Sequence, residues 1–176
     1  MTMTNDDHDP FNESTHRSNQ SGKLMKEEFF WNCVDEECPF GSDEGWEAYY
    51  SYRDWRSENP KNRIVDYMDE IMLERSDEYN DDLTADDVIL QSVNKPQTAF
   101  LGDEYDPQVL DETVIAICLG QLIDEGKIDL SLRPFARVAI ERQRHKAFNP
   151  SRHRLDILRA CARVIHDAQP LQEKGM

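Results

Sequence analysis

A histidine and a carboxylate near the C-terminal end of the chain have the spacing that proton transfer would need. His153 and Asp156 lie three residues apart on a predicted helix, so an imidazole and a carboxylate on one face could share a proton. Pairs of this kind are common on helix surfaces that have no catalytic role. His145 and His166, like His153, lie near arginines, whose positive charges oppose a metal ion. We therefore predict no catalytic residue and no histidine-based metal site.

The four cysteines offer a second kind of chemistry. Cys33 and Cys38 are separated by four residues, three of which are acidic. A zinc site needs two further ligands at a compatible spacing, and the sequence places none nearby. Cys118 and Cys161 lie in apolar segments and are expected to be small buried side chains. The sequence therefore predicts neither a metal site nor a cofactor, and no disulfide framework.

Motifs that identify enzymes are absent from the sequence. The chain contains no GxSxG, no HExxH and no phosphate-binding glycine loop. The acidic pairs at 81–82 and 86–87 lack the glycine and the terminal glutamate of an EF-hand calcium loop. We therefore expect a protein that has no catalytic activity of its own.

The spacing of apolar residues predicts an all-α fold. Ile64, Tyr67, Met68 and Ile71 recur at helical intervals, and no alternating strand pattern extends beyond about four residues. Apolar residues cover most of the circumference of the segment 109–123, so this helix should lie at the centre. We predict one domain of six or seven helices, arranged as a bundle or an irregular array.

Caps and breaks divide the chain into helices. Ser42, Thr84, Ser131 and Asn149 are predicted N-caps, and Gly126 is a predicted helix end. A further helix is expected from Lys23 to the Pro39-Phe40-Gly41 break. The expected domain organisation is a polar, loosely packed arm (1–22), an all-α body (23–170) and a short tail (171–176), with an acidic loop at 76–83 and a linker at 94–107.

Charge is divided unevenly along the 176 residues. The net charge is −16, yet residues 130–176 hold 10 Lys/Arg against 4 Asp/Glu, so residues 1–129 carry 32 Asp/Glu against 10 Lys/Arg. The polar start has no secretory-signal pattern, and no apolar stretch is long enough to span a membrane. We therefore expect a cytoplasmic protein with an acidic body (23–129) and a basic helical pair (130–168).

Aromatic and acidic residues are interleaved in the first part of the acidic body. Nine aromatic residues fall between Phe29 and Trp55, and helical spacing cannot bury all of them on one face. They are interpreted either as a corner of the core or as a partly exposed patch that binds a basic protein. The residues predicted to bind such a partner are Asp43, Glu44, Trp46, Glu47, Tyr50 and Asp54. In charge and size the chain is similar to immunity proteins that neutralise basic nucleases and to DNA-mimic proteins.

The basic C-terminal helices support three alternatives. They could neutralise the acidic body from within, bind nucleic acid, or contact the acidic face of a second copy to form a homodimer. The residues predicted for the second or third role are Arg144, Lys146, Arg152, Arg154 and Arg159. The preferred hypothesis is an inhibitor-type module that binds a basic protein, and the alternative is a nucleic-acid-associated regulator.

Overall fold

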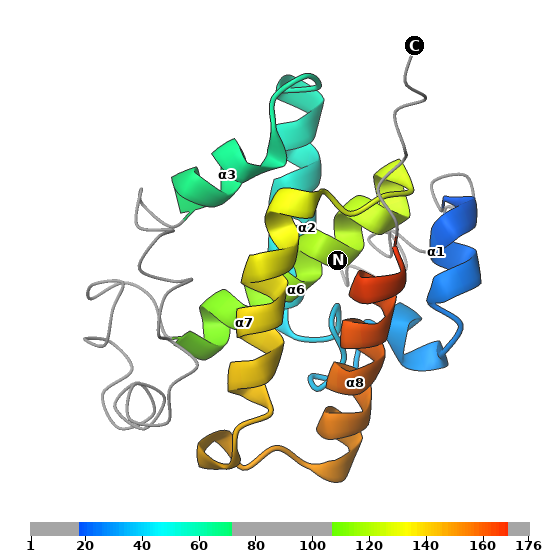
Figure 1. Ribbon diagram of the computed structural model, residues 1–176, viewed down its shortest axis with the longest axis vertical. Coiled ribbons are helices and arrows are strands. Elements are labelled where there is room, and N and C mark those ends of the chain that lie inside the picture. The colour runs from blue at the N-terminus through cyan, green and yellow to red at the C-terminus, as the bar shows by residue number, and fades with distance from the viewer. Residues whose placement is uncertain (1–17, 72–106, 169–176) are drawn as a thin grey trace, which may run out of the picture.

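The computed structural model describes residues 18–71 and 107–168, and Figure 1 shows their arrangement. These residues form six α-helices and three short 3-10 helices, and the described parts of the chain contain no strand. The α-helices are α1 (Asn19–Leu24), α2 (Asp43–Glu58), α3 (Ile64–Ile71), α6 (Pro107–Glu125), α7 (Arg133–Gln143) and α8 (Arg152–Asp167). The predicted all-α fold is confirmed. The expected loop 76–83, the Thr84 helix, most of the linker 94–107 and the tail 171–176 lie outside the described residues.

Helix α6 forms the centre of the fold, as its apolar sequence predicts. Every residue from Val114 to Ile123 is buried, so this helix has apolar neighbours on nearly all sides. Helices α2 and α7 both pack against α6, and α8 packs against α7 (Figure 1). Gly126 ends α6 with a φ of 73°, a left-handed conformation that glycine adopts without strain.

Helix α2 is fixed to α6 by one face only. Its buried residues are Gly45, Ala48, Tyr49 and Tyr52. Gly120 of α6 lies against the Tyr49 ring so closely that a Cβ there would be 2.6 Å from Cδ2 of that ring. The Tyr49 hydroxyl donates a hydrogen bond to Asp124 at 2.7 Å, and the Tyr52 hydroxyl donates one to Glu125 at the same distance. The opposite face of α2 is therefore left at the surface.

The N-terminal part of the fold differs from the sequence prediction. Residues 19–22, which the sequence predicts to be part of the arm, belong to α1. Ser18 caps this helix and donates from its hydroxyl to the Leu122 carbonyl at 2.6 Å. The helix expected from Lys23 to Pro39 is absent. A 3-10 helix, η2 (Glu28–Trp31), and a loop replace it, and Val34 in this loop is 86% exposed.

Two of the predicted helix caps are wrong and one is confirmed. Ser42 caps α2 by accepting from the Gly45 N–H. Asp129, and not Ser131, caps the turn η4 (Leu130–Leu132) that leads into α7. Ser151, and not Asn149, caps α8, because Asn149 ends the preceding turn η5 (Lys146–Phe148) in a left-handed conformation. The predictions failed because each loop holds two residues that can cap, and tertiary contacts select between them.

Candidate protein-binding face

The exposed side of α2 carries most of the residues predicted to bind a partner. Asp43, Glu47, Tyr50 and Asp54 follow one another at intervals of four, three and four residues, so they form one stripe along the helix. Trp46 lies beside this stripe, one turn before Tyr50. Asp43, Glu47 and Asp54 are exposed, whereas the residues on the opposite side of the helix are buried. We call Asp43, Trp46, Glu47, Tyr50 and Asp54 the α2 face.

The two aromatic residues of the α2 face contact each other. The Trp46 and Tyr50 rings meet edge to face, with centroids 5.0 Å apart, and both side chains are half-buried. Among the nine aromatic residues of this region, Phe30, Phe40, Tyr49 and Tyr52 are buried and the other five are half-buried. The aromatic group is therefore divided between the core and a set of partly exposed rings. Four rings build the core, and the pair on α2 adds apolar area to an acidic surface.

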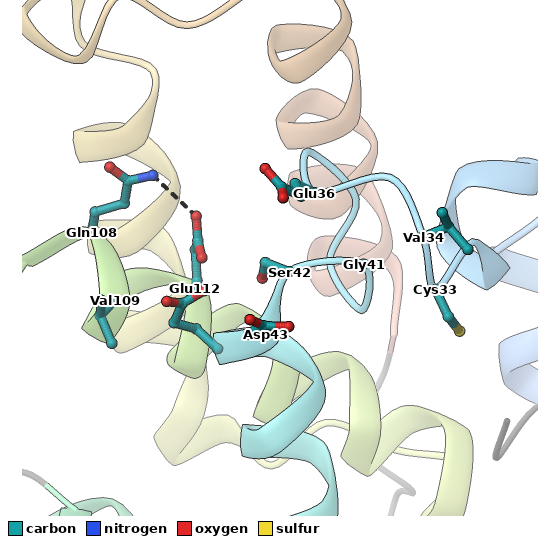
Figure 2. A pocket seen from close by; sticks show the side chains of 10 residues that line it. Cys33, Val34, Glu36, Gly41, Ser42, Asp43, Gln108, Val109 and Glu112 are labelled. Atoms are coloured by element: carbon teal, nitrogen blue, oxygen red, sulfur yellow. Dashed lines mark hydrogen bonds between the residues drawn. The ribbon is translucent and has the colours of Figure 1, made fainter. Parts of the chain in front are cut away.

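A cleft opens at the N-terminal end of the α2 face (Figure 2). It has a volume of about 670 Å³ and lies between the loop before α2 and the first turns of α6. Figure 2 shows the carboxylates of Glu36, Asp43 and Glu112 around it, and Glu44 is a fourth acidic residue of its lining. Glu44 is the sixth predicted residue, and it faces this cleft and not the stripe.

The Glu112 side chain is only 11% exposed, whereas Glu36 and Asp43 are exposed. Burial raises the pKa of Glu112 above the ordinary value, although hydrogen bonding from Gln108 and the charge of Arg154 act in the opposite direction. Gln108 donates to Glu112 at 3.2 Å, and the Arg154 guanidinium is 3.9 Å away. A negative charge in this position is incompletely compensated, so a cation that entered the cleft would be attracted to it.

Comparison with known proteins yields no relative for this arrangement. No family model, no curated protein and no solved structure matches the chain. Within residues 18–71 and 107–168, no helix has both the length and the apolar character that crossing a membrane requires. The site must therefore be interpreted from its own chemistry.

The basic residues named by the sequence do not form one uniform surface. Arg144, Lys146 and Arg152 are exposed at one end of α7 and the start of α8, and their side chains make no hydrogen bond or ion pair with the described residues. Arg159 is exposed but contacts Asp156 at 3.3 Å. The side chain of Arg154 is only 13% exposed, because it turns inward to the Glu37 carbonyl and Glu112.

Several C-terminal arginines hold the fold together. Arg163 contacts Glu27 and donates to the Leu24 carbonyl at 3.1 Å, which ties α8 to the N-terminal segment. Arg133 donates to the carbonyls of His166 and Ala168 at the end of α8. Arg142 is wholly buried against Asp111. The ion pairs of Arg142 with Asp111 and of Arg163 with Glu27 join the basic helices to carboxylates of the acidic body.

The structure also assembles a cluster that sequence reasoning missed. Ligand atoms of Asp35, Cys38 and His153 all lie within 4.8 Å of one another. His153 Nε2 is 2.9 Å from Asp35 Oδ2, whereas Asp156, its expected partner, contacts Arg159. More than a hundred residues separate His153 from the other two, so spacing within the sequence holds no signal for the cluster. Cys33 is not a member, and its thiol lies 3.9 Å from the Trp31 carbonyl.

The titration behaviour of the cluster follows from its surroundings. Burial, followed by the negative charge of Asp35, raises the pKa of the Cys38 thiol to about 12. The Glu37 backbone N–H, and then hydrogen bonding from His153, lower the pKa of Asp35. Cys38 is therefore a protonated thiol at neutral pH and a poor nucleophile, while Asp35 is ionised.

Proposed function

We propose that this chain is a protein-binding module whose α2 face and adjoining cleft engage a basic protein. One observation carries the proposal: five of the six residues named from the sequence lie together on the surface of α2, and the sixth lines the cleft beside them. A stripe of carboxylates around a pair of aromatic rings is a surface suited to recognition, with the rings as anchors and the acids as the source of attraction.

The chemistry of the cleft specifies the kind of partner. Glu36, Asp43, Glu44 and Glu112 line a space large enough for a long side chain. No basic residue is among the described residues that line it, and Arg154 lies 3.9 Å from Glu112. A lysine or arginine of the partner would find several acceptors there. The partner is therefore a protein with an exposed basic segment, and the module acts by covering that segment, as an inhibitor does.

A specific observation favours one competing function. Arg144, Lys146 and Arg152 are exposed and make no ion pair with the described residues, so they are available to phosphate groups. A nucleic-acid-associated regulator would use this surface and would gain nothing from the α2 face. The same residues would also serve a homodimer in which the basic surface of one copy meets the α2 face of another.

Charge reversal distinguishes these functions. The full chain is used to capture partners from nuclease-treated and untreated lysate at low and high salt, and each captured protein is purified for kinetics. Reversal of Asp43, Glu44 and Glu47 to Lys should abolish binding of a basic protein, because the attraction and the cleft are both altered. Reversal of Arg144, Lys146 and Arg152 to Glu should leave that binding intact.

A matched control separates local from overall charge. Reversal of the exposed residues Glu28, Glu141 and Asp167 to Lys changes the net charge by the same amount at sites outside α2. If this control weakens binding as much as the α2 reversal, the α2 face is not the site. Capture that disappears with nuclease, or binding of double-stranded DNA that the arginine reversal removes, would support the regulator instead. Self-association lost in both reversals would identify the homodimer.

A further inference from the structure

We propose that Asp35, Cys38 and His153 form a binding site for a single zinc ion. The three side chains offer a carboxylate oxygen, a sulfur and an imidazole nitrogen, which are the three donor types that zinc takes from proteins. They come from two parts of the chain, a loop before α2 and the first turn of α8. The site does not depend on the α2 face.

The distances suit a tetrahedral ion. Zinc bonds of about 2.0–2.3 Å place neighbouring ligand atoms roughly 3.3–3.8 Å apart. The ligand atoms of the cluster lie within 4.8 Å of one another, and one pair, His153 Nε2 and Asp35 Oδ2, is 2.9 Å apart. Movements of about an ångström would therefore complete the geometry, and the His153 side chain, which is 49% exposed, is free to make them.

The loop that carries two of the ligands is fixed by its own hydrogen bonds. Asn32 Oδ1 accepts from the backbone N–H groups of Val34 and Asp35, both at 2.9 Å. Asp35 Oδ1 accepts from the Glu37 N–H at 3.0 Å, which leaves Oδ2 directed at His153. The hydrogen bond to Oδ1 orients the whole carboxylate, in the way that hydrogen-bond partners outside the metal's own ligands orient those ligands in metal sites.

The loop is also attached to the helix that supplies the third ligand. The Ser151 hydroxyl donates to Glu37 at 2.6 Å, and Arg154 donates to the Glu37 carbonyl. These two contacts lie on either side of His153 in sequence. They hold Asp35 and Cys38 next to the start of α8 before any ion binds, so little ordering is needed on binding.

Charge and donor type select the ion. Formation of the zinc–sulfur bond displaces the Cys38 proton into solvent. The thiolate and the Asp35 carboxylate then supply two negative charges, which balance a divalent cation in a half-buried place. Magnesium and calcium require oxygen ligands in larger number, so a site with sulfur and imidazole favours zinc. Three protein ligands leave a fourth position for water or for a side chain of another molecule.

The test uses the untagged full chain with Zn²⁺ alone and with Co²⁺ as a spectroscopic substitute. We expect about one bound Zn²⁺ per chain and, with Co²⁺, both a thiolate charge-transfer band and the strong visible absorption of tetrahedral coordination. H153Q and D35N should each weaken Zn²⁺ binding by at least 10–100-fold, roughly the loss that follows removal of outer partners alone. C38S should abolish the thiolate band.

Two control variants keep the result specific. C33S and H166Q remove a thiol and an imidazole that lie outside the cluster, and both should bind Zn²⁺ as the unaltered chain does. H153Q is the decisive variant, because His153 lies at the surface and its replacement does not threaten the core. The proposal is overturned if no thiolate band appears with Co²⁺, or if H153Q binds Zn²⁺ as tightly as the unaltered chain.

Discussion

Asp111 of α6 and Arg142 of α7 form an ion pair that is wholly buried between the two helices. Both side chains have 0% exposure, and Arg142 Nε donates to Asp111 Oδ2 at 2.8 Å. Gln143 donates to the same oxygen at 2.7 Å, so the carboxylate is surrounded by donors. A pair this deep is stable only while both partners are present, because either charge alone would be stranded in the core.

Removal of the carboxylate should therefore destabilise the fold severely. Asp111→Ala leaves the Arg142 guanidinium buried without its counter-charge, and we expect a loss of about 3–5 kcal/mol in the free energy of unfolding, measured with urea. Asp156→Ala removes an exposed ion pair with Arg159 and should cost less than about 1 kcal/mol. Equal losses in the two variants would contradict the buried position of the pair.

The central position of α6 makes a separate prediction. Leu119 has 0% exposure, so Leu119→Ala should leave a cavity and cost about 2–5 kcal/mol of unfolding free energy. Leu130 is 60% exposed, and Leu130→Ala is the matched control, with an expected change within about 0.5 kcal/mol. A Leu119→Ala loss as small as that of the control would place α6 at the periphery.

The cleft predicts a dependence of stability on pH. Burial raises the pKa of Glu112 above its ordinary value of 4.5, so the protonated carboxyl favours the fold, and this stabilisation is lost as the pH rises through the folded-state pKa. Glu112→Gln is neutral at every pH. We expect this variant to melt about 1–3 °C above the unaltered chain at pH 7, with the difference shrinking as the pH falls toward 4.5. Glu141→Gln, at an exposed position, should show no such trend.

The proposed interface predicts different kinetic effects for its two kinds of residue. Tyr50→Ala removes an anchoring ring and should speed dissociation of the basic partner by about tenfold or more. Asp54→Lys should instead slow association and flatten its dependence on salt, because exposed charges act mainly on the encounter. Surface plasmon resonance with the captured partner measures both rates. Identical effects of the two substitutions would argue against the division of roles.

Periodicity within the sequence was sufficient to predict the long helices. The apolar stretch at 109–123 and the Ser42 cap lead to α6 and α2 as observed, because both signals are local and strong. The segment after Lys23 was predicted as a helix because it contains many apolar residues. There, Phe29, Phe30 and Trp31 are consecutive, so they cannot share one helix face, and a 3-10 turn distributes them instead.

For the candidate sites too, local signals in the sequence were predictive and long-range contacts were not. The α2 face could be predicted because its residues are close in sequence and share one helical spacing. The inward turn of Arg154 and the meeting of His153 with Asp35 depend on contacts across 117 and 118 residues. Such pairings are decided by how the helices pack, and no short-range pattern encodes them. Which residues share a helix face was therefore easier to predict than which distant residues contact each other.

The contacts of the segment 18–38 with α6 and α8 have a consequence for biosynthesis. Ser18 bonds to Leu122, Arg154 to Glu37 and Arg163 to Leu24, across 104, 117 and 139 residues. On the ribosome, the segment 18–38 emerges long before the helices that receive it. This segment can dock only after α6 and α8 have been translated, so its docking is a late step of folding. Truncated nascent chains that end before α8 should consequently be recognised by chaperones and proteases as incomplete.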